Sequence, residues 1–367
     1  MIVFTLIGVW EQCKVEELCK ISTGKGNTQD KVENGKYPFY VRSENIERSN
    51  YFLYDQEAVL TVGDGVGTGR VFHYVSGKYN LHQRVYRMYD FNKQISAKYF
   101  YYYFSLNFHR RVRSLTAKTS VDSVRLNMIA DMEIKYPSEL EQLKIFSFLD
   151  YLIKSITLHQ RKLDQLKELK KAYLQVMFPE KDEIVPRMRF VDFEGEWELC
   201  KLGDVANRYD NLRVPITASK RISGNTPYYG ANGIQDFVEG YTHDGEFILV
   251  AEDGANDLKD YPVQYVNGKV WVNNHAHVLQ AKQSIANNKF LMNAIKNINI
   301  ELFLVGGSRA KLNADIMMKL EINMPVKNEQ IRVSEFCTQL DNIITIYQNK
   351  LNQLKSLKKS YLQNMFI

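Results

Sequence analysis

Two long stretches of the chain place apolar residues at alternating spacings of four and three. This heptad pattern predicts two long helices, at residues 141–178 and 329–367, that pack through one apolar seam. At 1.5 Å per residue each helix would extend for roughly 57 Å, far longer than an average globular helix, so each needs a partner along its length. The predicted seam residues are Leu149, Leu152, Ile156, Leu163, Leu166, Tyr173 and Met177 in the first helix and Leu340, Ile344, Leu351, Leu354, Tyr361 and Met365 in the second.

The second helix repeats the first. KLDQLKELKKAYLQVMF at 162–178 returns as KLNQLKSLKKSYLQNMF at 350–366, and WEQCK at 10–14 returns as WELCK at 197–201. We therefore predict two tandem copies, each a domain of ordinary size followed by one long helix. The predicted boundaries are a first domain at 1–140, its helix at 141–178, a linker at 179–196, a second domain at 197–328 and its helix at 329–367.

The order of these segments predicts how the helices pair. The linker begins at Pro179, which lacks an N–H group and cannot continue a helix. Because the second domain starts soon after the first helix ends, the second helix should run back antiparallel to the first. Met365 and Phe366 should then dock in the first domain, as Met177 and Phe178 dock in the second.

Both domains alternate apolar and polar residues in short runs broken by glycines, which predicts strands. The expected fold class is mixed α/β (α+β), with two repeated domains and an antiparallel coiled-coil spacer. Asp64-Gly65 matches Asp253-Gly254, and Gly77-Lys78 matches Gly268-Lys269, whereas the residues between these anchors differ. A shared frame with different polar surfaces suits two related domains that recognise different things. The apolar residues 1–9 are too few to span a bilayer and are expected to form a first strand or a shortened leader.

Composition adds little, and no motif indicates catalysis. The net charge of +6 weakly favours an anionic partner, and the four scattered cysteines are typical of a cytoplasmic protein and lack zinc-site spacing. His73, His82, His275 and His277 lack helical metal spacing, and we expect no carboxylate cluster beside them. GDGVGTGR at 63–70 matches no nucleotide-binding motif and is interpreted as a turn between strands. We predict no catalytic centre, no metal site and no cofactor on this chain.

Polar side chains beside glycines are candidate DNA contacts. Arginine and the amides of Gln and Asn make bidentate contacts to guanine and adenine in the major groove, although for any single residue a solvated loop is the simpler interpretation. These candidates are Arg42, Ser43, Asn45, Arg70, His82, Gln83 and Arg84 in the first domain and Asn232, Asn273, Asn274 and His275 in the second. We also predict a basic, phosphate-binding loop in each domain, with Arg110, Arg111, Arg113 and Lys118 in the first and Arg309 and Lys311 in the second. The lysines of the long helices are interpreted as a solvated face.

Over nearly its whole length the chain resembles the specificity subunits of type I restriction-modification systems. The resemblance rests on W-E-x-x-K at each domain start, the L-N and I-x-x-P lead into each helix, and the duplicated helix itself. It implies two target-recognition domains that each read one half of a bipartite site in double-stranded DNA. It also implies two modification subunits around the helices, with Leu169 and Leu357 as candidate contacts, and added restriction subunits. S-adenosylmethionine, ATP and magnesium would be bound by those partners, which would catalyse adenine methylation and restriction. No membrane partner is expected.

Two other interpretations stay open at this point. A self-contained DNA methyltransferase or nuclease with a recognition module is disfavoured because its catalytic motifs are missing. A coiled-coil scaffold without a DNA role is disfavoured by the paired basic segments and by two domains that are related yet divergent. Assays of the purified chain for DNA binding, methylation and cleavage would separate these three classes.

Overall fold

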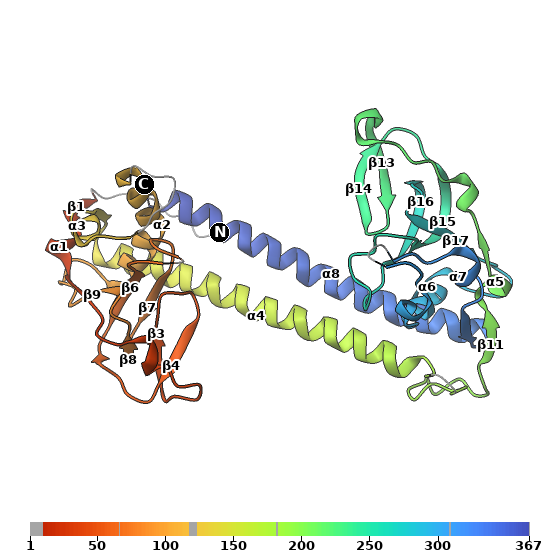
Figure 1. Cartoon of the computed structure of the whole chain (residues 1–367), viewed down its shortest axis with the longest axis horizontal. Helices are drawn as coiled ribbons and strands as arrows, with labels where there is room; N and C mark the ends of the chain where they lie inside the picture. The colour runs from red at the N-terminus through yellow and green to blue at the C-terminus, as the bar shows by residue number, and fades with distance from the viewer. Residues whose placement is uncertain (1–9, 66, 117–122, 181–182, 308–309, 367) are drawn as a thin grey trace. The chain divides into compact units, whose positions relative to one another are not determined.

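A computed structural model describes residues 10–65, 67–116, 123–180, 183–307 and 310–366. The chain divides into two compact units (Figure 1). The first unit comprises residues 1–159 and 350–367, and the second unit comprises residues 160–349. Each long helix is therefore shared, with one part belonging to each unit. Residues 1–9, for which a first strand was predicted, lie outside the described residues.

The first unit contains two four-stranded sheets, ordered β2-β9-β6-β7 and β4-β3-β8-β5, and an antiparallel pair of β1 with β10. Its elements before the long helix are β1 (Glu11–Lys14), α1 (Val15–Leu18), β2 (Lys20–Thr23), η1 (Thr28–Asp30), β3 (Tyr37–Tyr40), β4 (Ile46–Ser49), β5 (Tyr54–Asp55), β6 (Ala58–Val62), β7 (Phe72–Val75), β8 (Lys78–Leu81), β9 (Val85–Tyr89), α2 (Ala97–Leu115), α3 (Leu126–Ala130) and β10 (Glu133–Tyr136).

Strand β6 explains the layering of the first unit. All five of its residues are buried, and successive side chains point to opposite faces. Val59 joins the apolar core that α2 covers, whereas Ala58 and Leu60 join the core between the two sheets. A strand that is apolar on both faces therefore lies in the middle of the unit, with a helix on one side and a sheet on the other.

The second unit has one six-stranded sheet, ordered β12-β17-β15-β16-β13-β14, and an antiparallel pair of β11 with β18. Its elements between the long helices are β11 (Glu198–Lys201), α5 (Leu202–Val205), β12 (Ala206–Arg208), η2 (Asp210–Leu212), η3 (Ala218–Lys220), β13 (Ser223–Gly230), β14 (Gly233–Val238), β15 (His243–Ala251), β16 (Val263–Val272), β17 (Ala276–Ala281), α6 (Asn288–Lys296), η4 (Ile300–Phe303), α7 (Ala314–Met317) and β18 (Glu321–Met324).

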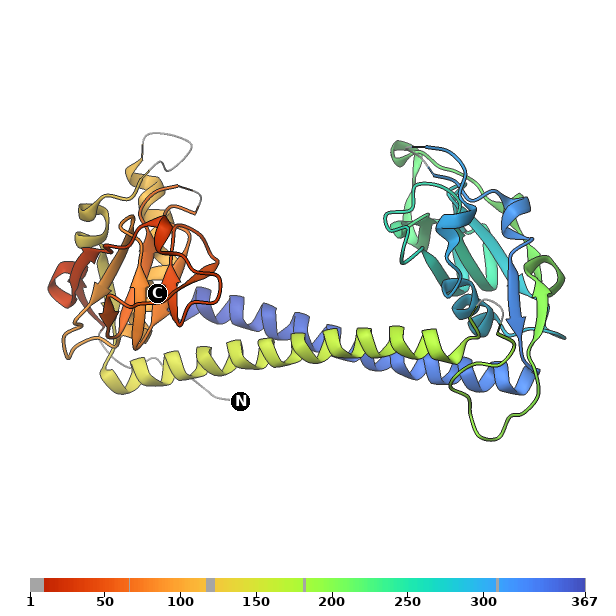
Figure 2. The same cartoon turned by 60° about the horizontal axis from the view of Figure 1, so that its bottom comes forward.

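The long helices are α4 (Glu139–Met177) and α8 (Lys327–Asn364), and they pack antiparallel within each unit (Figures 1 and 2). In the second unit, the Tyr173 ring lies 5.1 Å from the Phe336 ring, and Lys170 pairs with Asp341 at 2.5 Å. Residue numbers rise along α4 in the direction in which they fall along α8, so the two helices are antiparallel here. Every predicted seam residue is buried or half-buried, as a packed coiled-coil stripe requires.

The docking predicted for the helix ends is confirmed within each unit. In the first unit, the Phe366 ring lies 5.5 Å from Tyr99 and 5.8 Å from Tyr103, and Met365 is buried in the same core. In the second unit, Met177 and Phe178 enter the core in the same way. The sequence repeat therefore corresponds to a repeated packing arrangement, in which the C-terminal end of a long helix packs into the core of each unit.

Among the described residues, no helix combines the length with the apolar character that a membrane crossing needs.

Candidate nucleic-acid interface

Three loops of the first unit meet at one end of its sheets. The N–H group of Gly63 donates to the carbonyl of Arg84 at 2.8 Å, and the carbonyl of Gly63 accepts from Val124 at 2.7 Å. The N–H group of His82 donates to the carbonyl of Tyr40 at 3.0 Å. These bonds join the loop after β6 to the turn between β8 and β9 and to the segment before α3, and they join that turn to the end of β3. We call this set of loops the first loop cluster.

The second unit forms the same three bonds with different residues. Glu252 donates to the carbonyl of His275 at 2.9 Å and accepts from Leu312 at 2.7 Å, and Asn273 donates to the carbonyl of Tyr229 at 3.0 Å. We call this set the second loop cluster. Most candidate DNA contacts predicted from the sequence lie in or beside these two clusters, although they are far apart along the chain.

The turn between β8 and β9 is closed by a buried histidine. His82 is 5% exposed, and its Nδ1 accepts a hydrogen bond from the backbone N–H group of Arg84 at 3.0 Å. Burial lowers the pKa of His82, and Arg42 and Arg84 act in the same direction, which favours the lone pair that this bond requires. Gln83, between the two bonded residues, is exposed at the tip of the turn.

The turn between β16 and β17 repeats this arrangement with an amide. Asn273 is 3% exposed, and its Oδ1 accepts from the backbone N–H group of His275 at 2.9 Å. Asn274 is exposed at the tip. His82 and Asn273 were predicted as DNA contacts, and the structure places both side chains inside their turns. The exposed positions that they support are Gln83 and Asn274.

An aspartate holds the cations of each cluster. In the first, Asp64 lies 3.3 Å from Arg42 and 3.6 Å from Arg84. In the second, Asp253 lies 2.5 Å from Nδ1 of His275. The two aspartates were matched in the sequence, and each is followed by a glycine with positive φ, a backbone conformation that glycine adopts at little cost. The aspartate of this loop therefore faces arginines in one unit and an imidazole in the other.

Other predicted contacts also stabilise the loops. Asn232 donates from Nδ2 to the carbonyl of Gly254 at 2.8 Å and accepts from Asn256 at 2.9 Å. The Ser43 hydroxyl donates to the carbonyl of Asn45 at 3.2 Å. Two predicted phosphate contacts, Lys118 and Arg309, lie outside the described residues.

The prediction that residues 109–113 form a basic loop is wrong, because they lie within α2. Phe104, Phe108 and Val112 recur every fourth residue and are fully buried, which keeps the helix against the unit as far as Leu115. This apolar spacing was a signal in the sequence that the cluster of positive charges concealed.

The arginines of this segment differ in their surroundings. Arg111 donates from Nε to the carbonyl of Met128 at 3.0 Å and therefore anchors α3. Arg70 donates to Nε2 of His109 at 2.9 Å, and burial followed by the charge of Arg70 lowers the pKa of His109. Arg110 and Arg113 are exposed. They are the cations of this segment with the freest access to an anion.

The prediction that no carboxylates accompany the histidines is also wrong. Asp210, Glu252 and His277 gather beneath the second loop cluster, with Asp210 Oδ2 2.7 Å from His277 Nδ1. Arg213 lies 2.6 Å from Glu252, and Lys311 lies 2.7 Å from it. Residues at 210, 252 and 277 are too far apart in the chain for their spacing to have indicated this cluster.

The polar atoms of the cluster are joined in an ion-pair and hydrogen-bond network. His277 Nε2 lies 2.9 Å from the carbonyl of Leu312, and Nδ1 faces Asp210, so each ring nitrogen already has a hydrogen-bond partner within the protein. Arg213 and Lys311 supply positive charge beside both carboxylates. Burial raises the pKa of Asp210, but the interactions with His277, the backbone N–H group of Val278 and Arg213 together outweigh burial, so the net pKa is lowered.

This network predicts that the second unit loses stability in acid. The pKa values of Asp210 and Glu252 lie below their ordinary 3.8 and 4.5, so folding favours the ionised forms. That contribution is complete above the ordinary pKa values and is lost as pH falls from them through the lower pKa values of the folded state. Urea unfolding followed by the buried Trp197 should show a steeper loss of stability below about pH 5 in the wild type than in Asp210→Asn. The exposed Asp315→Asn is the control, and an unchanged pH profile for Asp210→Asn would contradict the assignment.

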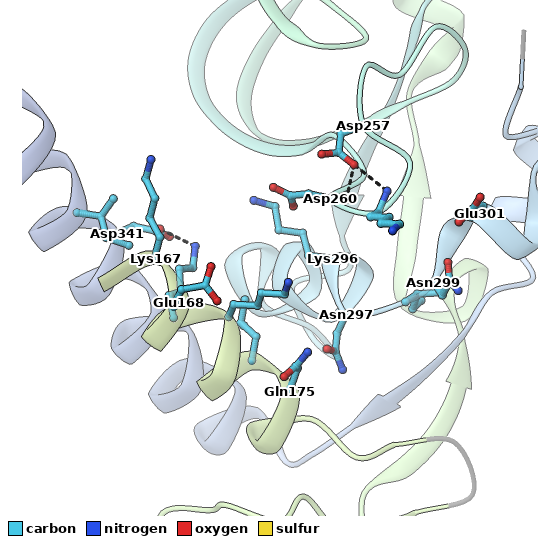
Figure 3. A pocket seen from close by; sticks show the side chains of 16 residues that line it. Lys167, Glu168, Gln175, Asp257, Asp260, Lys296, Asn297, Asn299, Glu301 and Asp341 are labelled. Atoms are coloured by element: carbon cyan, nitrogen blue, oxygen red, sulfur yellow. Dashed lines mark hydrogen bonds and ion pairs between the residues drawn. The ribbon is translucent and has the colours of Figure 1, made fainter. Parts of the chain in front are cut away.

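A pocket of about 1040 Å³ lies in the second unit between α4, α8 and the end of α6 (Figure 3). Five lysines and five carboxylates line it, so its formal charges balance and favour neither an anion nor a cation. Lys170 is 15% exposed and bound to Asp341, and burial lowers the pKa of Lys296. Lys170 therefore departs from the predicted solvated face. The ten charged residues are Lys167, Lys170, Lys171, Lys259, Lys296, Glu168, Asp257, Asp260, Glu301 and Asp341.

The duplicated clusters agree with comparisons to known proteins. A family model described as the type I restriction modification DNA specificity domain matches residues 8–168 and again residues 194–356. The chain belongs to this family. Each of the two copies of the type I specificity domain contains one loop cluster, and the predicted tandem repeat and mixed α/β fold are confirmed.

Relatives of the type I specificity family match parts of the chain. A candidate type I specificity subunit of Haemophilus influenzae is 46% identical over 150 residues, which is 40% of this chain and 38% of the relative. The EcoDI specificity subunit of Escherichia coli is 26% identical over 288 residues, 71% of this chain and 62% of the relative. The chain thus spans less than two thirds of the length of these curated relatives.

The solved S subunit of the type I system of M. genitalium has the same fold. It matches all of this chain and 98% of its own length with a TM-score of 0.75, at 16% sequence identity. At such low identity the likeness extends to the fold and not to individual side chains, which suits a frame whose exposed residues differ from one member to the next.

Proposed function

We propose that this chain is the DNA-recognition subunit of a type I restriction-modification complex, in which each unit reads one half of a bipartite site. The observation that carries the proposal is the pair of equivalent loop clusters. Their backbone bonds are the same, whereas their exposed side chains differ. Partner subunits would bring S-adenosylmethionine, ATP and magnesium, and would carry out adenine methylation and restriction. The chain itself would be non-catalytic.

Selection of duplexes from a random pool tests this proposal. The full chain should enrich two fixed blocks separated by a constant number of unspecified base pairs, and it should neither methylate nor cleave DNA by itself. A single continuous motif would contradict reading by two units. The absence of any enriched sequence would contradict the DNA-recognition role as a whole.

The phosphate contacts make binding depend on salt. Arg110 and Arg113 are exposed on the last turns of α2, where His109 accepts a hydrogen bond from Arg70 of the loop after β6. Each cation that displaces a counterion from phosphate contributes about 0.9 to the slope of log affinity against log salt. Arg110→Ala should therefore weaken binding to all sequences alike and flatten this slope by roughly 0.9, as measured by fluorescence anisotropy. Lys93→Ala, at the other end of α2, is the control, and an unchanged slope for Arg110→Ala would remove this residue from the interface.

An apolar stripe on each long helix is the proposed contact for a modification subunit. Leu143, Leu158 and the predicted Leu169 of α4 correspond in the repeat to Ile331, Ile346 and the predicted Leu357 of α8, and all six are exposed. Leu158 is 55% exposed and Ile346 65%, so large aliphatic side chains face water at equivalent positions. Apolar exposure on a surface favours burial against a partner. The repeat would therefore provide two equivalent docking faces, one for each of two modification subunits.

Single charged substitutions should each remove one modification subunit. Leu158→Lys places a charge in an apolar contact, so native mass spectrometry of co-expressed subunits should show one partner bound in place of two. Ile346→Lys should do the same, and the double variant should bind none. Thr157→Lys adds the same charge about 100° around the helix and is the control. Full occupancy with the double variant would exclude this stripe.

A further inference from the structure

Each unit presents one exposed amide at the tip of an equivalent turn, Gln83 in the first and Asn274 in the second. We propose that Gln83 and Asn274 each read an adenine in the major groove, an inference that rests on the proposed function. It assigns a base to a single named side chain in each half of the site.

The backbone on both sides of each tip is fixed. In the first unit, the Gln83 N–H group donates to the carbonyl of Gly26 at 2.8 Å, while its neighbours His82 and Arg84 bond to other loops. In the second, Asn273 and His275 make the corresponding bonds on either side of Asn274. A side chain on an anchored tip loses little freedom on binding, so its contacts contribute to discrimination between bases.

The chemistry of the amide selects the base. Adenine presents N7 as an acceptor and its N6 amino group as a donor, and one amide can satisfy both at once. Gln83 donates one of its two N–H groups from Nε2 to Oδ1 of Asn27 at 2.8 Å. One N–H group and Oε1 then remain, which together form the pair that adenine requires. Asn27 is itself held, because its backbone N–H group donates to Asp30 at 2.6 Å.

The side chains of Gln83 and Asn274 differ in their hydrogen bonding to the protein. Within the described part of the chain, the Asn274 side chain has no hydrogen-bonding neighbour that corresponds to Asn27. The orientation of Gln83 is therefore set before DNA arrives, whereas Asn274 must order its side chain on binding. We expect the first unit to discriminate more strongly than the second at the adenine position, and Asn27→Ala to weaken that preference without redirecting it to another base.

Carboxylate substitutions of the full chain test the assignment. Gln83→Glu and Asn274→Asp replace the donor with a second acceptor, and a carboxylate accepts from the N4 amino group of cytosine. Selection from a random duplex pool should then change adenine to cytosine at one position of one half-site for each variant. The wild-type preference at that position should be about 5- to 150-fold, the range expected for one bidentate contact. Asn50→Asp and Asn267→Asp change exposed amides elsewhere on the two units and should alter no position.

The possible outcomes distinguish a failure of the adenine assignment from a failure of the proposed DNA-recognition function. A bipartite site that neither carboxylate variant alters, in protein that melts at the wild-type temperature, would overturn the assignment and leave the proposed function intact. A change at a position where the wild type does not prefer adenine would also overturn it. A wild-type chain that enriches no sequence would overturn the proposed function first. One altered position per variant, each in a different half-site, is the supporting result.

Discussion

A fragment ending at Phe178 is expected to form a dimer that prefers an inverted repeat of the first half-site. The fragment contains the first domain and all of α4, but it lacks Tyr361, Met365 and Phe366, which close the core of the first unit. A second copy can replace them, because Met177 and Phe178 are their equivalents in the repeat and close the second unit in the same way. Burying the unpaired coiled-coil seam of α4 again contributes several kcal/mol at about 25 cal/mol per Å² of apolar surface.

The dimer follows from the antiparallel packing of α4 and α8. Each fragment would offer its α4 to the other, which makes an isologous contact with two-fold symmetry. Light scattering tests the mass, and selection of bound duplexes tests the symmetry of the preferred site. Phe178→Asp should block the dimer by placing a charge where an apolar end must be buried. A well-folded monomer, or a dimer that selects a direct repeat, would contradict the model.

Glu329→Ala is expected to destabilise the second unit by about 3–5 kcal/mol, as is typical when one member of a buried ion pair is removed. Glu329 is fully buried at the start of α8, and both of its oxygens accept hydrogen bonds from Arg189 of the linker at 2.7 Å. Without the carboxylate, the Arg189 guanidinium would remain largely buried without its counter-charge. Urea unfolding monitored by Trp197 fluorescence measures the loss.

The controls separate charge from shape. Glu335→Ala removes an exposed carboxylate from the same helix and should change the free energy of unfolding by less than about 0.5 kcal/mol. Glu329→Leu combined with Arg189→Met removes both charges and should recover most of the stability, because neither ion is then left unpaired. A loss below about 1 kcal/mol for Glu329→Ala would show that water reaches the pair.

The long helices were predictable because their signal is periodic and local. Alternating spacings of four and three continue through the seam of α4 from Leu149 to Met177, and the side chains that they select are those that the structure buries. The docking of Met365 and Phe366 followed from the order of segments alone. In both cases the repeat supplied a second, independent copy of the evidence.

The loop clusters were only partly predictable, because spacing along the chain says little about contacts between distant loops. The sequence indicated the residues 82–84 and 273–275 but not which of them face inward. Extending the match of Gly77-Lys78 with Gly268-Lys269 by a few residues aligns His82 with Asn273, and this would have indicated a shared turn. The Asp210 network offered no comparable signal, because its members come from separate strands and loops.

The first unit consists of two separate stretches of chain, residues 1–159 and 350–367, whereas the second unit is continuous from 160 to 349. Ribosomes deliver residues in chain order, and domains commonly fold during synthesis with the N-terminal one first. Here the order of completion is reversed, because the N-terminal unit receives Met365 and Phe366 only after the entire C-terminal unit has been made. A chain that ends at residue 349 would therefore contain every residue of the second unit but have an open first core. Proteases and chaperones would meet that exposed core.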